Sequence, residues 1–441
     1  MRAWFRDLRR AAGRLTAGFT LVELMVAITG GLFVTIAVFM LAKQATAVYT
    51  AEARMGNATI GSVAGFERLR LDIERAGFLV TPNIQRDPNR CGDPVGNAPA
   101  WPTYLQRLQA VFIFQPAVAP TSVLTGNHII PNEITLAGSY ASSDQFPTGP
   151  VFDTSPVTIQ LQTASPPMAR LGYATAGSPS AQAALLSTVF GASRILRIVD
   201  TAGKEQYGKI QSVTGGDTPS ITLTIDGKPP FIFRSSATGV SFKCGVPGTG
   251  ERSLVNVVNL IKYSVKDMTT NAAYAPLFAS PVVGSQATGA TTDVGRTELV
   301  RGELDADGNV IQGSEEIVSE FAVDLAFGIS YATIRAGDGG QVDSLGTIGP
   351  NSAAVSAWAG APPWPAGQGP QLLRVVRARL SIRSRAADRL SNIPTIGDGG
   401  LPIASGLYRI GLGANGAAPF ARVRTVQADI MLRNLSGVTW L

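Results

Sequence analysis

Residues 18–42 read GFTLVELMVAITGGLFVTIAVFMLA, and this stretch decides the class of the protein. From Leu24 to Ala42 it consists of uncharged and mostly apolar residues. As a helix with a rise of about 1.5 Å per residue, this part would span about 28 Å, close to the hydrocarbon thickness of a bilayer. We therefore predict a transmembrane helix. One acid, Glu23, stands near its start, and a lone carboxylate at membrane depth is costly enough to suggest a function.

The segment before the apolar stretch is basic. It carries a net charge of +4, which leaves only +2 of the total charge of +6 for the rest of the 441 residues. Arginines that precede a membrane helix stay on the cytoplasmic side, so everything after Lys43 is expected outside. The near-neutral body argues against a broad phosphate-binding surface and so against nucleic acid as the main partner. The charged residues of this segment are Arg2, Arg6, Asp7, Arg9, Arg10 and Arg14.

The small residue Gly18 precedes the apolar stretch, and Phe19 opens it. An ordinary signal peptide has the reverse order, with a small-residue cleavage site after a shorter apolar core. The segment GFTLVEL, residues 18–24, resembles instead the motif of type IV prepilins. That resemblance implies cleavage after Gly18 by a prepilin peptidase, methylation of the new N-terminal Phe19, and retention of the helix on the mature protein. It also implies that Glu23 docks the subunit, by pairing with the terminal ammonium of a neighbour inside an apolar helix bundle.

Beyond the membrane, the helix is expected to continue as an amphipathic helix and to end at Gly77. Apolar or small residues recur every three or four positions, with charges of both signs between them. The stripe consists of Met55, Thr59, Val63, Phe66, Leu69, Ile73 and Ala76.

The end of this helix carries a second resemblance. The run FERLRLDIERAGF, residues 66–78, is similar to that of PilW-like minor pilins and of the related GspJ-type minor pseudopilins of type II secretion. In those families an aspartate precedes a closing Ala-Gly-aromatic sequence. Here these residues are Asp72, Ala76, Gly77 and Phe78.

After Phe78 the pattern changes to alternation and turns, which predicts strands. The segments concerned are 220–227, 230–236, 254–267, 297–331, 372–385 and 422–435. In 372–385, apolar residues alternate with arginine and serine, so one face should be buried and the other solvated. The apolar positions are Val376, Ala378, Leu380 and Ile382, and the others are Arg377, Arg379, Ser381 and Arg383. The order of strands after residue 250 also looks PilW-like, whereas residues 80–250 match no family pattern.

The expected fold is therefore pilin-like α+β, with a long N-terminal helix packed on an antiparallel β-rich domain. Residues 1–18 would be a cytoplasmic leader, and residues 19–43 the transmembrane half of the helix. Residues 44–78 would form its amphipathic half, and residues 79–441 a periplasmic head.

The chain has two cysteines, Cys91 and Cys244, and no CxxC motif. An exported chain with two cysteines usually pairs them, which predicts a disulfide. The single histidine, His128, lacks nearby cysteine or histidine ligands for zinc and has no nucleophile motif beside it. The sequence thus offers no catalytic constellation, and no enzyme activity, cofactor or metal is expected.

Three weaker patterns have simpler interpretations. Residues 411–416 match GxGxxG, but Pro419 and the strand-like segment that follows leave no helix for a dinucleotide site. The segment from Asp305 to Glu316 resembles a calcium loop, yet Val310 stands where such a loop requires glycine, so a turn is favoured and calcium binding stays open. A row of arginines could contact DNA or an acidic partner, although a solvated face is favoured. The row is Arg377, Arg379, Arg383 and Arg385.

The resemblance implies a minor pilin that takes part in starting type IV pilus assembly, at or near the tip. Its partners would be the prepilin peptidase, other minor pilins, the major pilin, the inner-membrane assembly platform and membrane lipid. It would reside in a bacterial inner membrane, with its head in the periplasm, and then in the pilus. One alternative is a GspJ-type pseudopilin of type II secretion. Another is an adhesin or DNA-uptake receptor on a pilin anchor.

Overall fold

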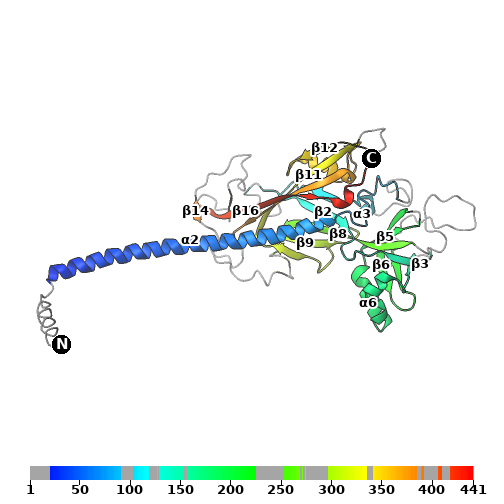
Figure 1. Ribbon diagram of the computed structural model, residues 1–441, viewed down its shortest axis with the longest axis horizontal. Coiled ribbons are helices and arrows are strands. Elements are labelled where there is room, and N and C mark those ends of the chain that lie inside the picture. Colours follow the sequence, from blue (N-terminus) through cyan, green and yellow to red (C-terminus); the bar gives the residue numbers. More distant parts are fainter. Residues whose placement is uncertain are drawn as a thin grey trace, which may run out of the picture. The chain divides into compact units, whose positions relative to one another are not determined.

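The computed structural model has an α+β fold, as the sequence predicts, with a long apolar N-terminal helix and two antiparallel sheets (Figure 1). It describes residues 20–90, 103–118, 127, 129–152, 156–201, 203–224, 253–268, 271, 274, 296–334, 341–384, 389–391, 406–409 and 418–440. The chain divides into two compact units, residues 1–56 and 57–441.

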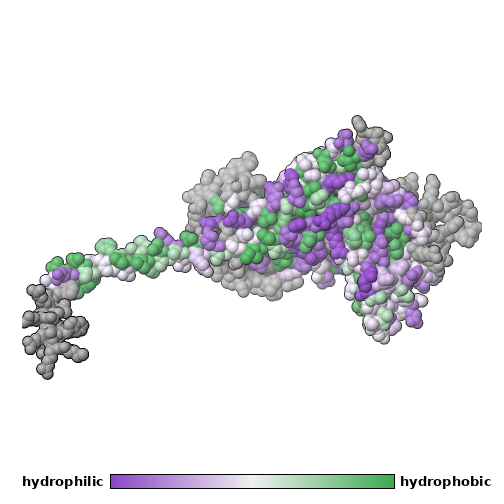
Figure 2. All heavy atoms as spheres, viewed as in Figure 1, coloured by the Kyte–Doolittle hydropathy of each residue, from purple (hydrophilic) through white to green (hydrophobic). Residues whose placement is uncertain are grey.

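The first unit contains the beginning of helix α2 (Leu21–Arg75). The most apolar 18-residue window of its segment Leu21–Thr50 has a mean hydropathy of 2.4, and none of that window is buried. Figure 2 shows this part of the helix as largely apolar surface on the face in view. By length and composition the segment can cross a membrane or act as a signal sequence.

Threonine hydroxyls in this apolar segment are satisfied by the helix itself. Thr29 donates to Met25 O at 2.9 Å, and Thr35 donates to Gly31 O at 2.8 Å. A hydroxyl bonded to the carbonyl of the preceding turn leaves no unsatisfied donor, so both residues are compatible with apolar surroundings.

The second unit begins with the remainder of α2. The predicted stripe is confirmed near the end of the helix, where Phe66, Leu69, Ile73 and Ala76 are buried. At Val63 it is wrong, because that side chain is 49% exposed.

The buried face of α2 is made of small residues instead where the stripe fails. Ser62 is fully buried, and Gly65 lies against strand β10 (Glu316–Ser319). A Cβ atom at Gly65 would stand 2.7 Å from Ser319 Cβ, so this approach requires glycine. Ser319 Oγ also donates to Gly61 O at 3.2 Å. The backbone of α2 at Gly61 and Gly65 therefore packs directly against Ser319 of β10, and the apolar periodicity of the sequence does not predict this contact.

The helix ends as predicted. Its last residue is Arg75, and Gly77 follows with a φ of +79°, a conformation that favours glycine. The Gly77 N–H donates to Ala137 O at 2.9 Å, so the chain enters the sheet region directly from the helix.

Among the described residues, the first sheet has ten strands, and all its pairs are antiparallel. Its main path is β1 (Val111–Phe114), β2 (Glu133–Gly138), β8 (Leu254–Lys266), β3 (Phe146–Phe152), β4 (Thr158–Leu161), β7 (Ser220–Leu223), β6 (Glu205–Thr214) and β5 (Ile195–Val199). Strand β9 (Glu298–Leu304) pairs with β8 and β10. The long strand β8 is its centre, because it pairs with β2, β3, β5 and β9.

The second sheet follows the order β12 (Val342–Ile348), β11 (Ala322–Ile334), β13 (Leu373–Arg383), β16 (Ala418–Met431) and β14 (Arg389–Ser391), with β15 (Leu407–Arg409) also on β16. The strands predicted in 254–267, 297–331, 372–385 and 422–435 are confirmed. In 220–227 only β7 is described as a strand, and 230–236 lies outside the described residues.

Hydrophobic clusters organise the second unit. The largest joins the end of α2 to the inner faces of both sheets. In Figure 1, β11 and β16 accordingly lie on one side of this part of α2, with β8 and β9 on the other. A separate cluster lies among β3 to β7 and α6 (Pro179–Val189), and we call this part the side lobe, residues 146–223. A small third cluster lies around Ile84 and Tyr207.

Short helices complete the description. They are α3 (Thr103–Gln106), α5 (Pro166–Arg170), η2 (Tyr173–Thr175), η3 (Ala353–Val355), α8 (Ser356–Ala359), η4 (Pro370–Leu372) and η6 (Arg433–Leu435).

Candidate functional site

Glu23, the predicted docking residue, lies in the first turn of α2. Its Oε2 accepts hydrogen bonds from the backbone N–H of Thr20 at 3.0 Å and from the Thr20 hydroxyl at 2.9 Å. In return the Glu23 N–H donates to Thr20 Oγ1 at 3.2 Å. This reciprocal arrangement is a capping box, which satisfies donors that the start of a helix otherwise leaves unpaired. The T-x-x-E spacing of Thr20 and Glu23 predicts this capping box. The prepilin motif alone does not predict a helix-capping role for Glu23.

The residues expected to be processed, Gly18 and Phe19, lie outside the described residues. Cleavage after Gly18 and methylation of Phe19 remain predictions. The same holds for the pairing of Glu23 with the N-terminal ammonium of a neighbouring subunit.

Both cysteines also lie outside the described residues, so the Cys91–Cys244 disulfide remains a prediction. The same is true of His128 and of the GxGxxG segment at 411–416.

Asp72, the acid of the second sequence resemblance, forms a buried junction between α2 and the first sheet. Its Oδ2 accepts from Tyr263 Oη of β8 at 2.8 Å and from Arg301 Nε of β9 at 2.6 Å. Tyr140 Oη donates to the Asp72 carbonyl at 2.7 Å. Burial, followed by the negative charge of Asp72, raises the pKa of Tyr263, so this phenol remains a neutral donor. One carboxylate thus joins the helix to two strands.

The rest of that motif fixes the end of α2. Ala76 is fully buried, and its carbonyl accepts from Asn434 Nδ2 at 3.0 Å. The Phe78 carbonyl accepts from the Ser139 N–H at 2.9 Å. The motif residues therefore bring together the end of α2, the residue that follows β2, and the turn η6. The motif thus has a structural role, whereas the sequence alone linked it only to a family.

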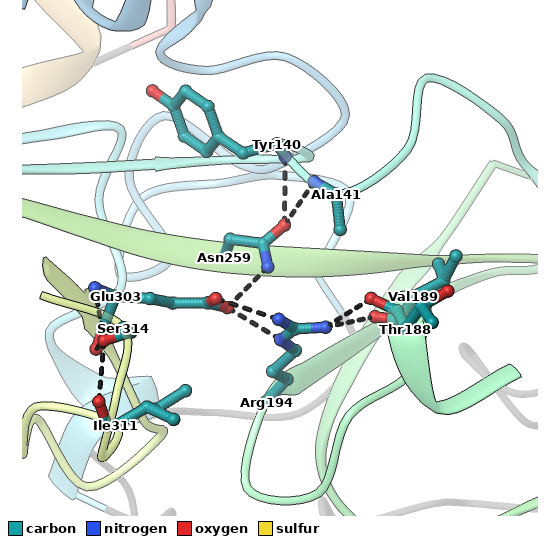
Figure 3. A network of polar contacts seen from close by, with 9 residues as sticks. All are labelled: Tyr140, Ala141, Thr188, Val189, Arg194, Asn259, Glu303, Ile311 and Ser314. Carbon is teal, nitrogen blue, oxygen red and sulfur yellow. Dashed lines mark hydrogen bonds and ion pairs between the residues drawn. The ribbon is translucent and has the colours of Figure 1, made fainter. Parts of the chain in front are cut away.

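A second polar junction fastens the side lobe to the central strands (Figure 3). Arg194 pairs with both carboxylate oxygens of Glu303, at 2.7 and 2.9 Å. Its Nη1 donates to Thr188 O and Val189 O at the end of α6, both at 2.9 Å. Asn259 of β8 donates to Glu303 Oε1 at 2.6 Å. Sequence reasoning missed this junction because Arg194 and Glu303 are far apart in the chain.

Tyr140 belongs to both junctions. Its backbone N–H donates to Asn259 Oδ1 at 3.0 Å, as Figure 3 shows, while its hydroxyl reaches the Asp72 carbonyl. The attachment of α2 and the attachment of the side lobe therefore share one residue after β2.

The arginine row corrects one prediction. Val376, Ala378, Leu380 and Ile382 are buried as expected. The opposite face is only partly solvated, because Arg377 pairs with Asp429 at 2.6 Å and Arg379 with Asp324 at 3.0 Å.

Arg383 departs further from the prediction of a solvated face. It is 1% exposed, and its guanidinium lies over the rings of Phe321 and Tyr408, at 4.8 and 5.8 Å. Arg385 lies outside the described residues. Since the three described arginines face carboxylates or aromatic rings, this row does not present a set of unpaired cations to DNA.

The segment from Asp305 to Glu316 is a turn between strands, which was the favoured interpretation. Asp305 Oδ1 accepts from the N–H groups of Asp307 and Asn309, at 2.9 and 2.8 Å. Asp307 pairs with Lys209 at 2.5 Å, and Glu316 pairs with Arg301 at 3.5 Å. In the part of the chain that the structure describes, no three or more His, Cys, Asp or Glu residues form a group able to hold a metal ion.

No protein-family model, curated protein or solved structure matches this chain.

Proposed function

We propose that this protein is a PilW-like minor pilin that helps to start assembly of a type IV pilus. The observation that carries the proposal is the unburied apolar segment of α2, which begins at Leu21, two residues after Phe19, and holds the capped acid Glu23 in its first turn. An apolar helix of this length needs lipid or other apolar helices around it. The helix of a pilin is surrounded first by lipid in the inner membrane and then by other pilin helices in the fibre.

In this proposal the chain is an assembly component without enzyme activity. A prepilin peptidase removes residues 1–18, the helix enters the bundle of other pilin helices, and residues 79–441 form the head offered to other minor pilins. The buried Asp72 junction supports this role, because it holds the head to the helix that would carry it.

The mature N-terminus tests the first step. Purified membrane-bound protein should begin at a methylated Phe19 with the apolar helix still attached, as mass spectrometry of the terminal peptide would show. A mature chain that begins after the apolar segment, near Ala42 or Ala45, would identify an ordinary signal peptide and overturn the proposal.

Two substitutions of Glu23 separate its possible roles. Glutamine can replace glutamate in a capping box, so Glu23→Gln keeps the helix cap but removes the charge, whereas Glu23→Val removes both. Pairing with a neighbour's ammonium requires the charge. We therefore expect both variants to be cleaved and to stay in the membrane, and both to lose co-purification with pilin partners.

The pattern of results decides between explanations. Normal assembly of Glu23→Gln with failure of Glu23→Val would assign Glu23 to the helix cap alone. Loss of cleavage in either variant would assign it to peptidase recognition. Co-purification of the unmodified protein with secretion components instead of pilus components would favour the pseudopilin alternative.

A further inference from the structure

The outer face of the first sheet carries exposed aromatic residues. Side chains alternate along a strand, so Val111 and Ile113 of β1 enter the main core while Phe112 and Phe114 point to the opposite side. Phe114 is 47% exposed, and Phe112 is half-buried. Phe112 and Phe114 thus place apolar rings on the open face of β1, an edge strand of the sheet.

These rings line a groove. A cavity of about 420 Å³ lies over this face, which is within the range of about 300–1,000 Å³ for ligand pockets. In register across the strands, Phe112 lies opposite Thr135 of β2, and Thr135 lies opposite Lys262 of β8. Leu260 adds an apolar side chain to the lining, and the turn at Asp307 closes the groove on the β9 side.

The charges around the groove are mostly paired. Lys262 pairs with Glu133 at 2.7 Å, and Asp307 pairs with Lys209 at 2.5 Å. Arg107 also lines the groove, is exposed, and forms no ion pair or hydrogen bond through its side chain with any described residue. Among the described residues that line it, the groove thus presents one unpaired cation, Arg107, beside apolar rings.

We propose that this groove binds a short peptide segment of a partner protein in which an apolar side chain stands next to a carboxylate. The apolar side chain would pack on Phe112, Phe114 and Leu260, and the carboxylate would pair with Arg107, whose planar guanidinium suits bidentate pairing. One unpaired cation matches one acidic group rather than a polyanion such as DNA.

This inference goes beyond the proposed pilin function and does not depend on it. Every residue that forms the groove belongs to the head, so failure of the N-terminal predictions would leave it unaffected. It gives the head a binding site for one kind of peptide segment, on the face formed by β1, β2 and β8.

Binding of two labelled tetrapeptides to the full-length protein in detergent tests the proposal. Both carry the sequence Gly-Leu-Phe followed by Asp or by Lys, with amidated ends, so that only the charge next to the aromatic residue differs. Fluorescence polarisation should show at least tenfold tighter binding of the acidic peptide. Arg107→Gln should weaken that binding about tenfold, and Phe114→Ala should weaken it as well.

Arg424→Gln is the matched control, because Arg424 is an exposed arginine on β16 of the other sheet. It should leave the affinity for the acidic peptide unchanged. Equal binding of the two peptides, no saturable binding of either, or the same effect from Arg107→Gln and Arg424→Gln would overturn the proposal.

Discussion

Asp72 shows at the scale of a single residue how the head is fixed to its helix. Removal of its carboxylate would leave the half-buried guanidinium of Arg301 with only Glu316, at 3.5 Å. Loss of one partner of a buried pair costs several kcal/mol, so Asp72→Ala should lower the free energy of unfolding by about 3 kcal/mol in urea titrations.

The matched control for this change is Asp429→Ala. Asp429 also pairs with an arginine, Arg377, but its side chain is 54% exposed. An exposed pair contributes about 0–1 kcal/mol. Equal losses of unfolding free energy in the two variants would contradict the role given to Asp72.

Glu298 should make the stability of the head depend on pH. It is fully buried, and burial raises its pKa to about 7 although Arg296 beside it lowers that pKa. Glu320 faces the same arginine at 3.3 Å, and the Phe321 N–H donates to Glu298 at 2.9 Å. Above the unfolded pKa, the native state still holds a proton that the unfolded chain has released, so stability falls as the pH rises from about 4.5 to 7.

Glu298→Gln should abolish this contribution. In urea unfolding at several pH values, the unfolding free energy of the unmodified protein should fall by up to about 3 kcal/mol relative to that of the variant between pH 4.5 and 7.5. A constant difference across that window would show that Glu298 does not titrate there.

At the scale of elements, the contact between α2 and β10 depends on the lack of a side chain. Gly65→Ala adds a Cβ only 2.7 Å from Ser319 Cβ, and overpacking of this kind costs about 1–3 kcal/mol. On the same helix, a Cβ at Gly56 meets nothing within 4 Å. Since alanine is the better helix former by about 1 kcal/mol, Gly56→Ala should leave stability unchanged or raise it.

Thermal or urea unfolding of the two alanine variants checks this pair. We expect changes of opposite sign in the free energy of unfolding. Both substitutions raise the helix propensity equally, but only the Cβ at Gly65 is crowded. Stabilisation by both substitutions would show that α2 and β10 can separate without cost.

Elements in which apolar residues recur with a regular helical or strand spacing were predictable from the sequence. The end of α2 shows this in Leu69 and Ile73, and β13 shows it in Val376 and Leu380. Features that depend on distant partners were not predictable. Arg383 alternates like a surface residue, yet aromatic rings from other segments enclose it.

The side lobe escaped prediction for the same reason. Its short strands find partners across long stretches of chain, as β4 does with β7. For the candidate site, the motif identified Glu23 and Asp72, and the T-x-x-E spacing carries the capping signal. The two buried junctions could not be predicted, because they join residues that are far apart in the chain.

At the scale of the whole molecule, the predicted Cys91–Cys244 disulfide would close a loop that contains the side lobe. In the chain-entropy model, a loop of about 150 residues stabilises the native state by roughly 4–5 kcal/mol, less if the bridge is strained. Thiol labelling of unfolded, unreduced protein should find no reactive thiol, and reduction should then expose two. Two reactive thiols before reduction would rule the bridge out.

The central position of β8 has a consequence for the order of folding. Strands β2, β3 and β5 all precede it in the chain, yet each pairs with it, and β9 joins only afterwards. During synthesis, which proceeds from the N-terminus, several strands must therefore keep unpaired edges until the chain has been made up to Lys266, the end of β8. Pairings between distant segments slow folding, and unpaired edges favour aggregation meanwhile. We expect slow refolding of the head and a need for chaperones while the chain folds.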